Sequence, residues 1–415
     1  MKLLTHCLVL LLFFSNMALT QDKIVVLPGA KKIIGTEYAG YTHDANHCTL
    51  FYWFVASHNP ASPLIIWTNG GPGYSSLYGF FNETGPYHIT PALQLSPRQH
   101  AWNQFANYLI IDQPSGVGLS NTHQCKPVSD LNLGVHQYFH ALQYFLKLHP
   151  QYKNSPIYLS GESYAGTYLP LLAMKILKYN QQAKQKINLK GLVLISPWAD
   201  PIQQQSMDAT YAFYHGLITQ NQTIHLDKIY QQCKQLILAK QYLQANHICG
   251  KLDVQIKQFS KRHLCNIAYT QTQNNVLLDQ YLRQPSVLKA IHATQSKPFK
   301  TWSESVNKNY DPIIQRSLLS VYNQLLKKHL PILIFSGLND AKDTNYLGIE
   351  KFIQALKWDE KSSYLNAKRK NCGIGYSKMG GGLEWVTVFN AGHMVPQDQP
   401  KISGIVQKFT QPIVF

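Results

Sequence analysis

The sequence predicts an α/β protein with a mostly parallel central sheet and helices on both of its faces. Short runs rich in Ile, Val and Leu are flanked by turn residues, as strands buried on both faces are. These runs are 64–67, 108–111, 157–159, 192–195, 332–335 and 385–389. Between them, apolar residues recur at helical spacing, for example in 135–146 and from Leu169 to Leu177. Strands that alternate with helices form parallel sheets that are covered on both faces.

The alternation of strands and helices breaks between about 201 and 330. The chain has 415 residues, which favours two domains or one large domain with an insertion. The interrupting stretch is rich in Gln, Lys and Tyr, and its pattern is helical with few strands. We therefore predict one domain over 21–415, with a helical cap inserted at about 201–330.

The first twenty residues have the pattern of a secretory signal peptide. Lys2 is followed by an apolar run at 8–14 and by small residues at 18–20. The run is too short to span a membrane, so no stable membrane insertion is expected. The predicted destination is the secretory pathway, with the protein secreted, periplasmic, lysosomal or vacuolar.

The cysteines fit an exported protein. After the predicted signal peptide six remain, namely Cys48, Cys125, Cys233, Cys249, Cys265 and Cys372. An even number in an exported chain favours disulfides, and six cysteines allow 15 connectivities. Three of them cluster at 233–265, so we expect one bridge in that region. The sequence has no C-x-x-C pair, and we predict no metal site and no cofactor.

The formal net charge is +17, which raises the question of nucleic acid or anionic membranes as partners. The Lys and Arg residues are scattered, and the densest run, 368–370, has no interleaved aromatic residues. We therefore predict no nucleic-acid binding. The oligomeric state is left open.

A candidate nucleophile follows the apolar run 157–159. Residues 161–166 read Gly-Glu-Ser-Tyr-Ala-Gly and precede a helical pattern. A serine on a tight turn between a strand and a helix exposes its hydroxyl at the sheet edge, and the strained turn needs small neighbours. The strict pattern is G-x-S-x-G, whereas here Ala165 precedes Gly166. We predict an α/β-hydrolase fold with Ser163 as nucleophile; the alternative is a surface serine in a glycine-containing loop.

Partners for Ser163 occur in the chain order of α/β-hydrolases, which is serine, acid, histidine. His393 follows the strand at 385–389, and Asp340 follows the strand at 332–335. Asp343 is a rival for the acid, which would orient the imidazole. A glycine-rich loop at 69–73 follows the strand 64–67, and its N–H groups could form an oxyanion hole with the N–H of Tyr164. A phosphate-binding loop is disfavoured because the P-loop Lys-Ser/Thr is missing.

Taken together, these segments resemble the serine carboxypeptidase family over nearly the whole mature chain. The resemblance rests on motifs at 38–41, 50–54, 69–73, 85–86, 102–103, 113–118, 161–166 and 392–396. It implies an enzyme that hydrolyses the C-terminal bond of peptides and proteins through an acyl-enzyme. It also implies these roles: catalytic residues Ser163, Asp340 and His393; oxyanion N–H groups of Gly71 and Tyr164; substrate-carboxylate binding by Asn69, Glu83 and Glu162; and a wall of the leaving-residue pocket at Met394.

Two glutamates that hold a carboxylate are a physical puzzle, because ionised carboxylates repel one another. Crowding raises carboxyl pKa values, so Glu83 or Glu162 can keep a proton in mildly acid solution and donate a hydrogen bond. We therefore expect peptidase activity to be strongest at acid pH.

The chain departs from the family pattern at three places, one of which is the loop at 196–201, where the family has a glycine-asparagine loop. Tyr74 occupies the position of a cysteine, so the family's disulfide from that position cannot form. The acid loop reads Gly-Leu-Asn-Asp at 337–340. When the loop is aligned with the family's Gly-Asp-x-Asp motif from Gly337, the acid is Asp340. When it is aligned backwards from Asn345, Asp340 matches only if one residue is inserted, so Asp343 remains a candidate for the acid.

Two other functions remain as alternatives. One is an acyltransferase or esterase, which would have no need of Glu83 and Glu162. The other is a non-catalytic binding protein that keeps the fold, which the complete set of catalytic residue types disfavours.

Overall fold

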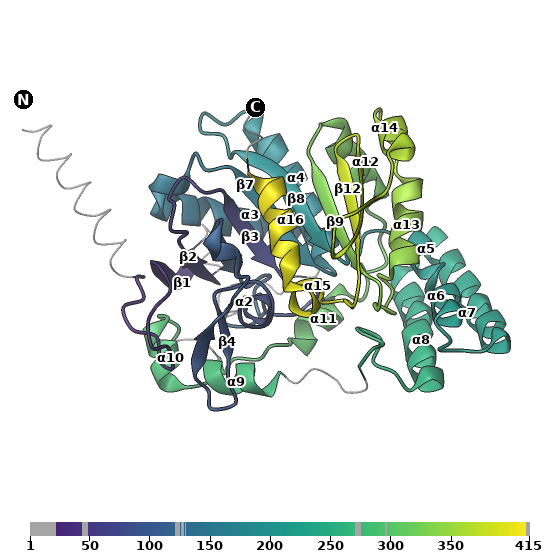
Figure 1. Cartoon of the computed structure of the whole chain (residues 1–415), viewed down its shortest axis with the longest axis horizontal. Coiled ribbons are helices and arrows are strands. Elements are labelled where there is room, and N and C mark those ends of the chain that lie inside the picture. Colours follow the sequence, from purple (N-terminus) through teal and green to yellow (C-terminus); the bar gives the residue numbers. More distant parts are fainter. Residues whose placement is uncertain are drawn as a thin grey trace, which may run out of the picture.

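The computed structural model describes residues 22–43, 49–120, 125, 128, 130–269, 275–294 and 297–411, so the expected signal peptide lies outside the described residues. Within them, the main sheet has the strand order β1-β2-β6-β3-β7-β8-β9-β12-β11-β10 (Figure 1). Its strands are β1 Glu37–His43, β2 Thr49–Val55, β3 Leu64–Thr68, β6 Asn107–Ile111, β7 Ile157–Glu162, β8 Leu189–Ile195, β9 Ile332–Gly337, β10 Lys370–Asn371, β11 Gly375–Gly380 and β12 Leu383–Val388. A small antiparallel pair consists of β4 Tyr87–Ile89 and β5 Leu95–Pro97.

The centre of the sheet is parallel and its edges are antiparallel. Each of the predicted strands is present, and they form the parallel run β6-β3-β7-β8-β9-β12. The mostly parallel sheet is thus confirmed. The edge pairs β1-β2 and β10-β11 were not predicted. Strands β10 and β11 are largely exposed and lack an apolar run, whereas the aromatic run of β2 was a usable signal.

Helices cover both faces of the sheet, as predicted (Figure 1). Side chains of α3, α4, α12 and α13 share one core with the sheet, and side chains of α2 and α16 share the core on the other face. The helices are α2 Leu77–Asn82, α3 Leu131–Leu148, α4 Ala165–Asn180, α5 Pro201–Gln205, α6 Asp208–Tyr214, α7 Gln220–Leu238, α8 Tyr242–Ser260, α9 Val276–Leu282, α10 Pro285–Ala290, α11 Glu304–Tyr310, α12 Leu319–Lys327, α13 Tyr346–Ala355, α14 Lys361–Asn366, α15 Val395–Asp398 and α16 Ser403–Thr410. Among the described residues, no helix combines the length and the apolar character needed to cross a membrane.

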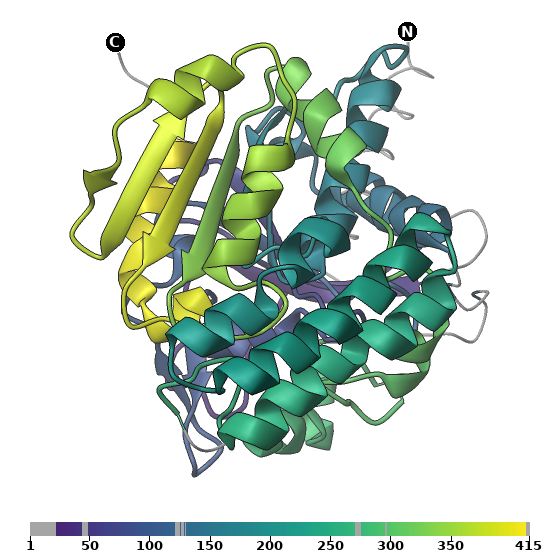
Figure 2. The same cartoon turned by 90° about the vertical axis from the view of Figure 1, so that its right-hand side faces the viewer.

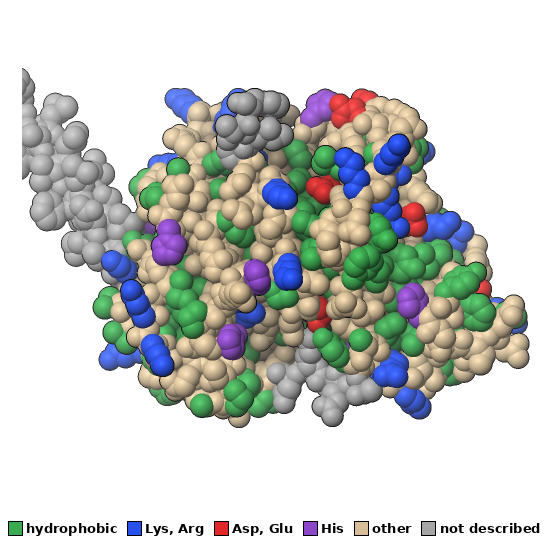
Figure 3. Space-filling view, in the orientation of Figure 1, with side chains coloured by type: hydrophobic (Ala, Val, Ile, Leu, Met, Phe, Trp, Pro, Cys, Tyr) green, Lys and Arg blue, Asp and Glu red, His purple; other side chains and the backbone are tan. Residues whose placement is uncertain are grey.

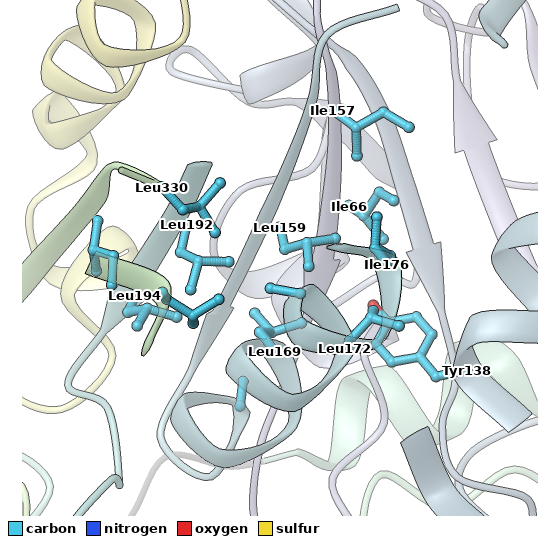
Figure 4. Close-up of a cluster of buried hydrophobic side chains, with 14 of the residues drawn as sticks. Ile66, Tyr138, Ile157, Leu159, Leu169, Leu172, Ile176, Leu192, Leu194 and Leu330 are labelled. Carbon is cyan, nitrogen blue, oxygen red and sulfur yellow. The ribbon is translucent and has the colours of Figure 1, made fainter. Parts of the chain in front are cut away.

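The two cores follow from the alternation of side chains along each strand. In β3, Leu64 and Ile66 belong to one core, whereas Ile65 and Trp67 belong to the other. Figure 4 shows Ile66 and the leucines of β7 and β8 beside Leu169, Leu172 and Ile176 of α4. Burying a leucine or isoleucine side chain contributes about 1.5–3 kcal/mol, so this layer holds β7 and α4 in a fixed relation.

The stretch between β8 and β9 forms helices α5 to α12, and its described residues add no strand to the sheet. Helices α6, α7 and α8 pack around a small core of their own (Figure 2). A disulfide joins Cys233 of α7 to Cys249 of α8, which confirms the bridge expected in this region. Cys265 and Cys372 are free thiols.

On the face drawn in Figure 3, Lys and Arg side chains occur at many separate places, and several of them lie near one another at the upper right. This agrees with the scattered distribution of basic residues in the sequence.

Glu37 is a fully buried carboxyl group that links β1 to its neighbours. It accepts hydrogen bonds from Trp53 Nε1, at 2.8 Å, and from the Tyr87 hydroxyl. Burial raises the pKa of Glu37 from 4.5 to about 7, although both hydrogen bonds lower it. The folded state therefore keeps a proton that the unfolded chain has lost above pH 4.5. The contribution of Glu37 favours folding at low pH and is lost as the pH rises towards 7.

We expect Glu37→Gln to make stability less dependent on pH, because glutamine does not titrate. Between pH 5 and 8 the free energy of unfolding should fall by about 3 kcal/mol more in the wild type than in the variant. Urea denaturation at both pH values measures this difference. Glu350→Gln, at an exposed position on α13, is the control. Equal pH dependence in the wild type and Glu37→Gln would contradict the prediction.

Candidate active site

Ser163 occupies the turn between β7 and α4. Its φ of +59° lies in the left-handed region, which is uncommon for residues other than glycine. Two backbone hydrogen bonds hold the turn, from Ser163 N to Ile195 O at 2.9 Å and from Trp198 N to Ser163 O at 2.8 Å. The last residue of β8 and the loop that follows it thus fix the strained conformation, and Ser163 lines a cavity at this end of the sheet.

Close packing explains the small residues around Ser163. A Cβ atom on Gly161 would lie 2.3 Å from Thr68 O, and one on Gly166 would lie 2.5 Å from Pro197 Cβ. The Cβ on Gly161 would also lie 2.7 Å from the Ala165 methyl group. The positions that require glycine are therefore 161 and 166, and Ala165 fits because Gly161 leaves room for its methyl group.

His393 lines the same cavity as Ser163 and is bonded to Asp340. His393 Nδ1 lies 2.9 Å from Asp340 Oδ2, and both side chains are buried. A carboxylate at Nδ1 keeps the proton on that nitrogen and leaves Nε2 for proton exchange. The structure thus brings together the three loops that end β7, β9 and β12.

The carboxyl group of Asp340 is held in place by its own loop. Lys342 N donates to Oδ1 at 2.9 Å, and Thr344 Oγ1 donates to Oδ2 at 2.9 Å. Thr344 Oγ1 also lies 3.0 Å from His393 Nδ1. Thr344 was not predicted, because a lone hydroxyl in a loop gives little signal in a sequence.

Asp343 is half-buried and lies near His393. Burial raises the pKa of Asp343 to about 6, and the nearby Lys342 and His393 lower it. Among the described residues, the side-chain groups within hydrogen-bonding distance of His393 Nδ1 come from Asp340 and Thr344. The geometry therefore favours Asp340 over Asp343 as the residue that orients the imidazole.

A cap segment, 264–267, passes between the acid loop and the histidine loop. Leu264 O accepts from Ala341 N at 2.8 Å, and Cys265 O accepts from His393 N at 2.6 Å. The cap therefore holds both loops through backbone groups. This contact was not predicted, because backbone groups make it and the side chains of the segment give no sign of it.

The glycine-rich loop lies against the turn that carries Ser163. A Cβ on Gly70 would lie 2.4 Å from Tyr164 N, so only glycine permits this approach. Gly71 adopts a φ of +109° and lines the cavity. Among the described residues, the backbone N–H groups of Gly71 and Tyr164 have no hydrogen-bond acceptor. Both N–H groups are therefore free to bind a developing negative charge.

Asn69, Glu83 and Glu162 form a buried group. Asn69 Nδ2 donates to Glu83 Oε1 at 3.0 Å, while Asn69 Oδ1 accepts from Trp67 Nε1 and Gly79 N. The orientation of the Asn69 amide is thus fixed from both sides.

Glu83 and Glu162, here called the carboxyl pair, are both buried, and the Oε2 atom of each has no hydrogen-bond partner among the described residues. Because an ionised carboxylate only accepts, a hydrogen bond from this pair to another carboxylate requires a proton on one of them. Burial raises the pKa of Glu83, and burial together with the charge of Glu83 raises the pKa of Glu162 well above its usual value. The pair therefore holds a proton in acid solution.

The cavity beside Ser163 has a volume of about 320 Å³. Of the residues predicted for the site, Asn69, Gly71, Glu162, Ser163, His393 and Met394 line it. Glu83, Tyr164 and Asp340 lie behind this lining and contact it. Three aromatic residues, Tyr74, Tyr78 and Trp302, complete much of its wall. A peptide end is of a size and polarity that such a cavity accepts.

The chain is similar to known serine carboxypeptidases in sequence and in structure. The model of the serine carboxypeptidase family matches residues 28–411. The chain is 33% identical over 397 residues to the venom serine carboxypeptidase of Apis mellifera. The aligned region covers 90% of this chain and 84% of that protein. It is 29% identical over 393 residues to serine carboxypeptidase S10 family member 1 of Dictyostelium discoideum, with 90% and 94% covered. The crystal structure of Kex1(Δ)p, a prohormone-processing carboxypeptidase from Saccharomyces cerevisiae, matches with a TM-score of 0.84 at 25% identity and covers 94% of this chain and 96% of that one.

Proposed function

Since the chain belongs to the serine carboxypeptidase family, a family of hydrolases, we propose that it removes C-terminal residues from peptides and proteins through an acyl-enzyme on Ser163. The observation that carries this proposal is the carboxyl pair beside Ser163, with Asn69 bonded to it. A substrate without a free C-terminal carboxylate has no need of such a group.

In the proposed reaction, Ser163 Oγ attacks the carbonyl carbon of the last peptide bond while its proton passes to His393 Nε2. Asp340 stabilises the imidazolium through Nδ1, at the 2.9 Å contact. The N–H groups of Gly71 and Tyr164 bind the oxyanion. His393 then protonates the leaving amine, the C-terminal residue departs, and water attacks the acyl-enzyme by the same steps in reverse.

The carboxyl pair accounts for the restriction to chain ends. When the pair holds a proton, it donates a hydrogen bond to the terminal carboxylate of the substrate, and Asn69 fixes the position of the pair. When both carboxyl groups are ionised, they repel that carboxylate. Met394 and the aromatic wall contact the side chain of the leaving residue. We also propose a secreted, periplasmic, vacuolar or lysosomal location, because disulfides persist in oxidising compartments.

We expect the preference for a free C-terminal carboxylate to weaken as the pH rises. The measurement is kcat/KM for a blocked dipeptide divided by kcat/KM for its C-terminal amide, because pH effects common to both substrates cancel in this ratio. Above the raised pKa of the carboxyl pair, the ratio should fall about tenfold per pH unit as the bound proton is lost. In Glu162→Gln the fall should be shallower, because the amide donates at every pH.

Glu384→Gln, on β12 and outside the cavity, is the control and should keep the pH profile of the wild type. An unchanged profile in Glu162→Gln would contradict the role of the carboxyl pair. A ratio near one at every pH would instead favour an esterase or an acyltransferase.

A further inference from the structure

A short strip of the cap pairs with the glycine-rich loop. Residues 301–303 lie antiparallel to residues 73–75, with Tyr74 opposite Trp302. Ser75 N donates to Thr301 O, and Ser303 N donates to Gly73 O, both at 2.9 Å. The hydrogen bonds thus flank the Tyr74–Trp302 pair, which is the non-hydrogen-bonded type of antiparallel pair. In this type the two Cα atoms are about 4.5 Å apart and the side chains are close.

The two rings contact each other and reach the backbone of Gly71. The ring centroids of Tyr74 and Trp302 are 4.8 Å apart, at an interplanar angle of 53°. A Cβ on Gly71 would lie 2.9 Å from Trp302 Cζ3, so the indole ring packs directly on this glycine. Trp302 is therefore in contact with the residue whose N–H we assign to the oxyanion hole.

The cap side of this contact is anchored by α9. Asp279 Oδ1 accepts from Thr301 N at 3.0 Å and from Thr301 Oγ1 at 2.7 Å. Arg283 donates to Asp279 Oδ2 at 2.8 Å and to Phe299 O at 2.7 Å. Trp302 thus extends from a segment that is held in place by α9.

The glycine-rich loop needs contacts with other segments to hold it in one conformation. Gly71 and Gly73 both have positive φ, at +109° and +111°. Glycine loses more conformational entropy than any other residue when it is ordered, so a loop with these residues is costly to hold in one shape. The sequence places Tyr74, rather than a cysteine, at the end of this loop, so no disulfide can start there.

We propose that the Tyr74–Trp302 pair is a non-covalent link that positions the N–H of Gly71 for catalysis. The inference rests on the proposed function, and both residues are positioning residues that act through Gly71. Trp302 also lines the cavity, so its effect on positioning must be separated from direct contact with the substrate.

We expect Trp302→Ala to lower kcat by about 10- to 100-fold, less than the loss of an oxyanion donor in full. The loss should be equal for blocked dipeptides that end in glycine and in phenylalanine, because both form the same oxyanion. Trp302→Phe should recover most of kcat, since a ring still covers Gly71. A loss confined to KM for the phenylalanine substrate would overturn the proposal and leave Trp302 as a wall of the pocket.

A covalent replacement provides an independent test. In a Cys265→Ala background, which removes the free thiol of the cavity, Tyr74→Cys with Trp302→Cys places two thiols at a separation suited to a disulfide. Oxidation with oxidised glutathione should raise kcat by at least tenfold over the same protein with both new thiols alkylated before oxidation. Mass spectrometry verifies the new bond. Formation of the bond without a gain in kcat would overturn the proposal.

Failure of this inference is distinguishable from failure of the proposed function. If Ser163→Ala is inactive and Trp302→Ala keeps full kcat for both substrates, the inference about positioning is wrong and the proposed function stands. If Ser163→Ala retains activity, the proposed function itself is wrong.

Discussion

Ser163→Ala is expected to lower kcat for a blocked dipeptide by about a millionfold, the loss that follows removal of a nucleophile whose partners act as a unit. The remaining rate should come from binding and the oxyanion N–H groups. The turn at Ser163 is held by backbone hydrogen bonds to Ile195 and Trp198, which alanine retains. The melting temperature should therefore change little. Single-turnover kinetics with purified enzyme measure the loss, and thermal unfolding checks the fold.

Ser160→Ala is the matched control for this variant. Ser160 is buried on the same strand, β7, three residues before Ser163, and its hydroxyl has no hydrogen-bond partner among the described residues. We expect it to keep the activity of the wild type. An organophosphonate should label the wild type and Ser160→Ala, and labelling of Ser163→Ala would show that another nucleophile reacts.

Asp340→Asn is expected to lower kcat by about 10³- to 10⁴-fold with little change in KM. The amide presents a donor or an uncharged acceptor to His393 Nδ1, so it stabilises neither the correct tautomer nor the imidazolium. The size of the loss depends on the contact of 2.9 Å between the two side chains. Steady-state kinetics at the pH optimum measure it.

Asp343→Asn separates the two candidates for the acid. Asp343 follows Asp340 by three residues and lies near His393. The side chains within hydrogen-bonding distance of His393 Nδ1 are nevertheless those of Asp340 and Thr344. We expect Asp343→Asn to lower kcat less than tenfold. A severe loss in Asp343→Asn, with activity retained in Asp340→Asn, would refute the assignment.

The central part of the fold could be predicted because its strands are buried on both faces. Such strands carry a nearly continuous run of apolar residues, as β3 and β9 do, and this run is visible in the sequence without any knowledge of the neighbouring strands. The edge strands β10 and β11 escaped prediction because exposed edges tolerate polar side chains. β11 pairs with β12 and β10 pairs with β11, so the places of both strands depend on contacts between separate segments.

The sequence by itself determined the family, the parallel sheet and the candidates Ser163 and His393. The reason is local: tight turns demand glycine at 161 and 166, and parallel strands bring their carboxyl ends to one edge. The tertiary structure alone decided which aspartate bonds to His393, how the cap segment 264–267 joins two loops, and that Trp302 covers Gly71. Each of these depends on backbone groups or rings from distant segments, and a backbone carbonyl has the same chemistry at every position in a sequence.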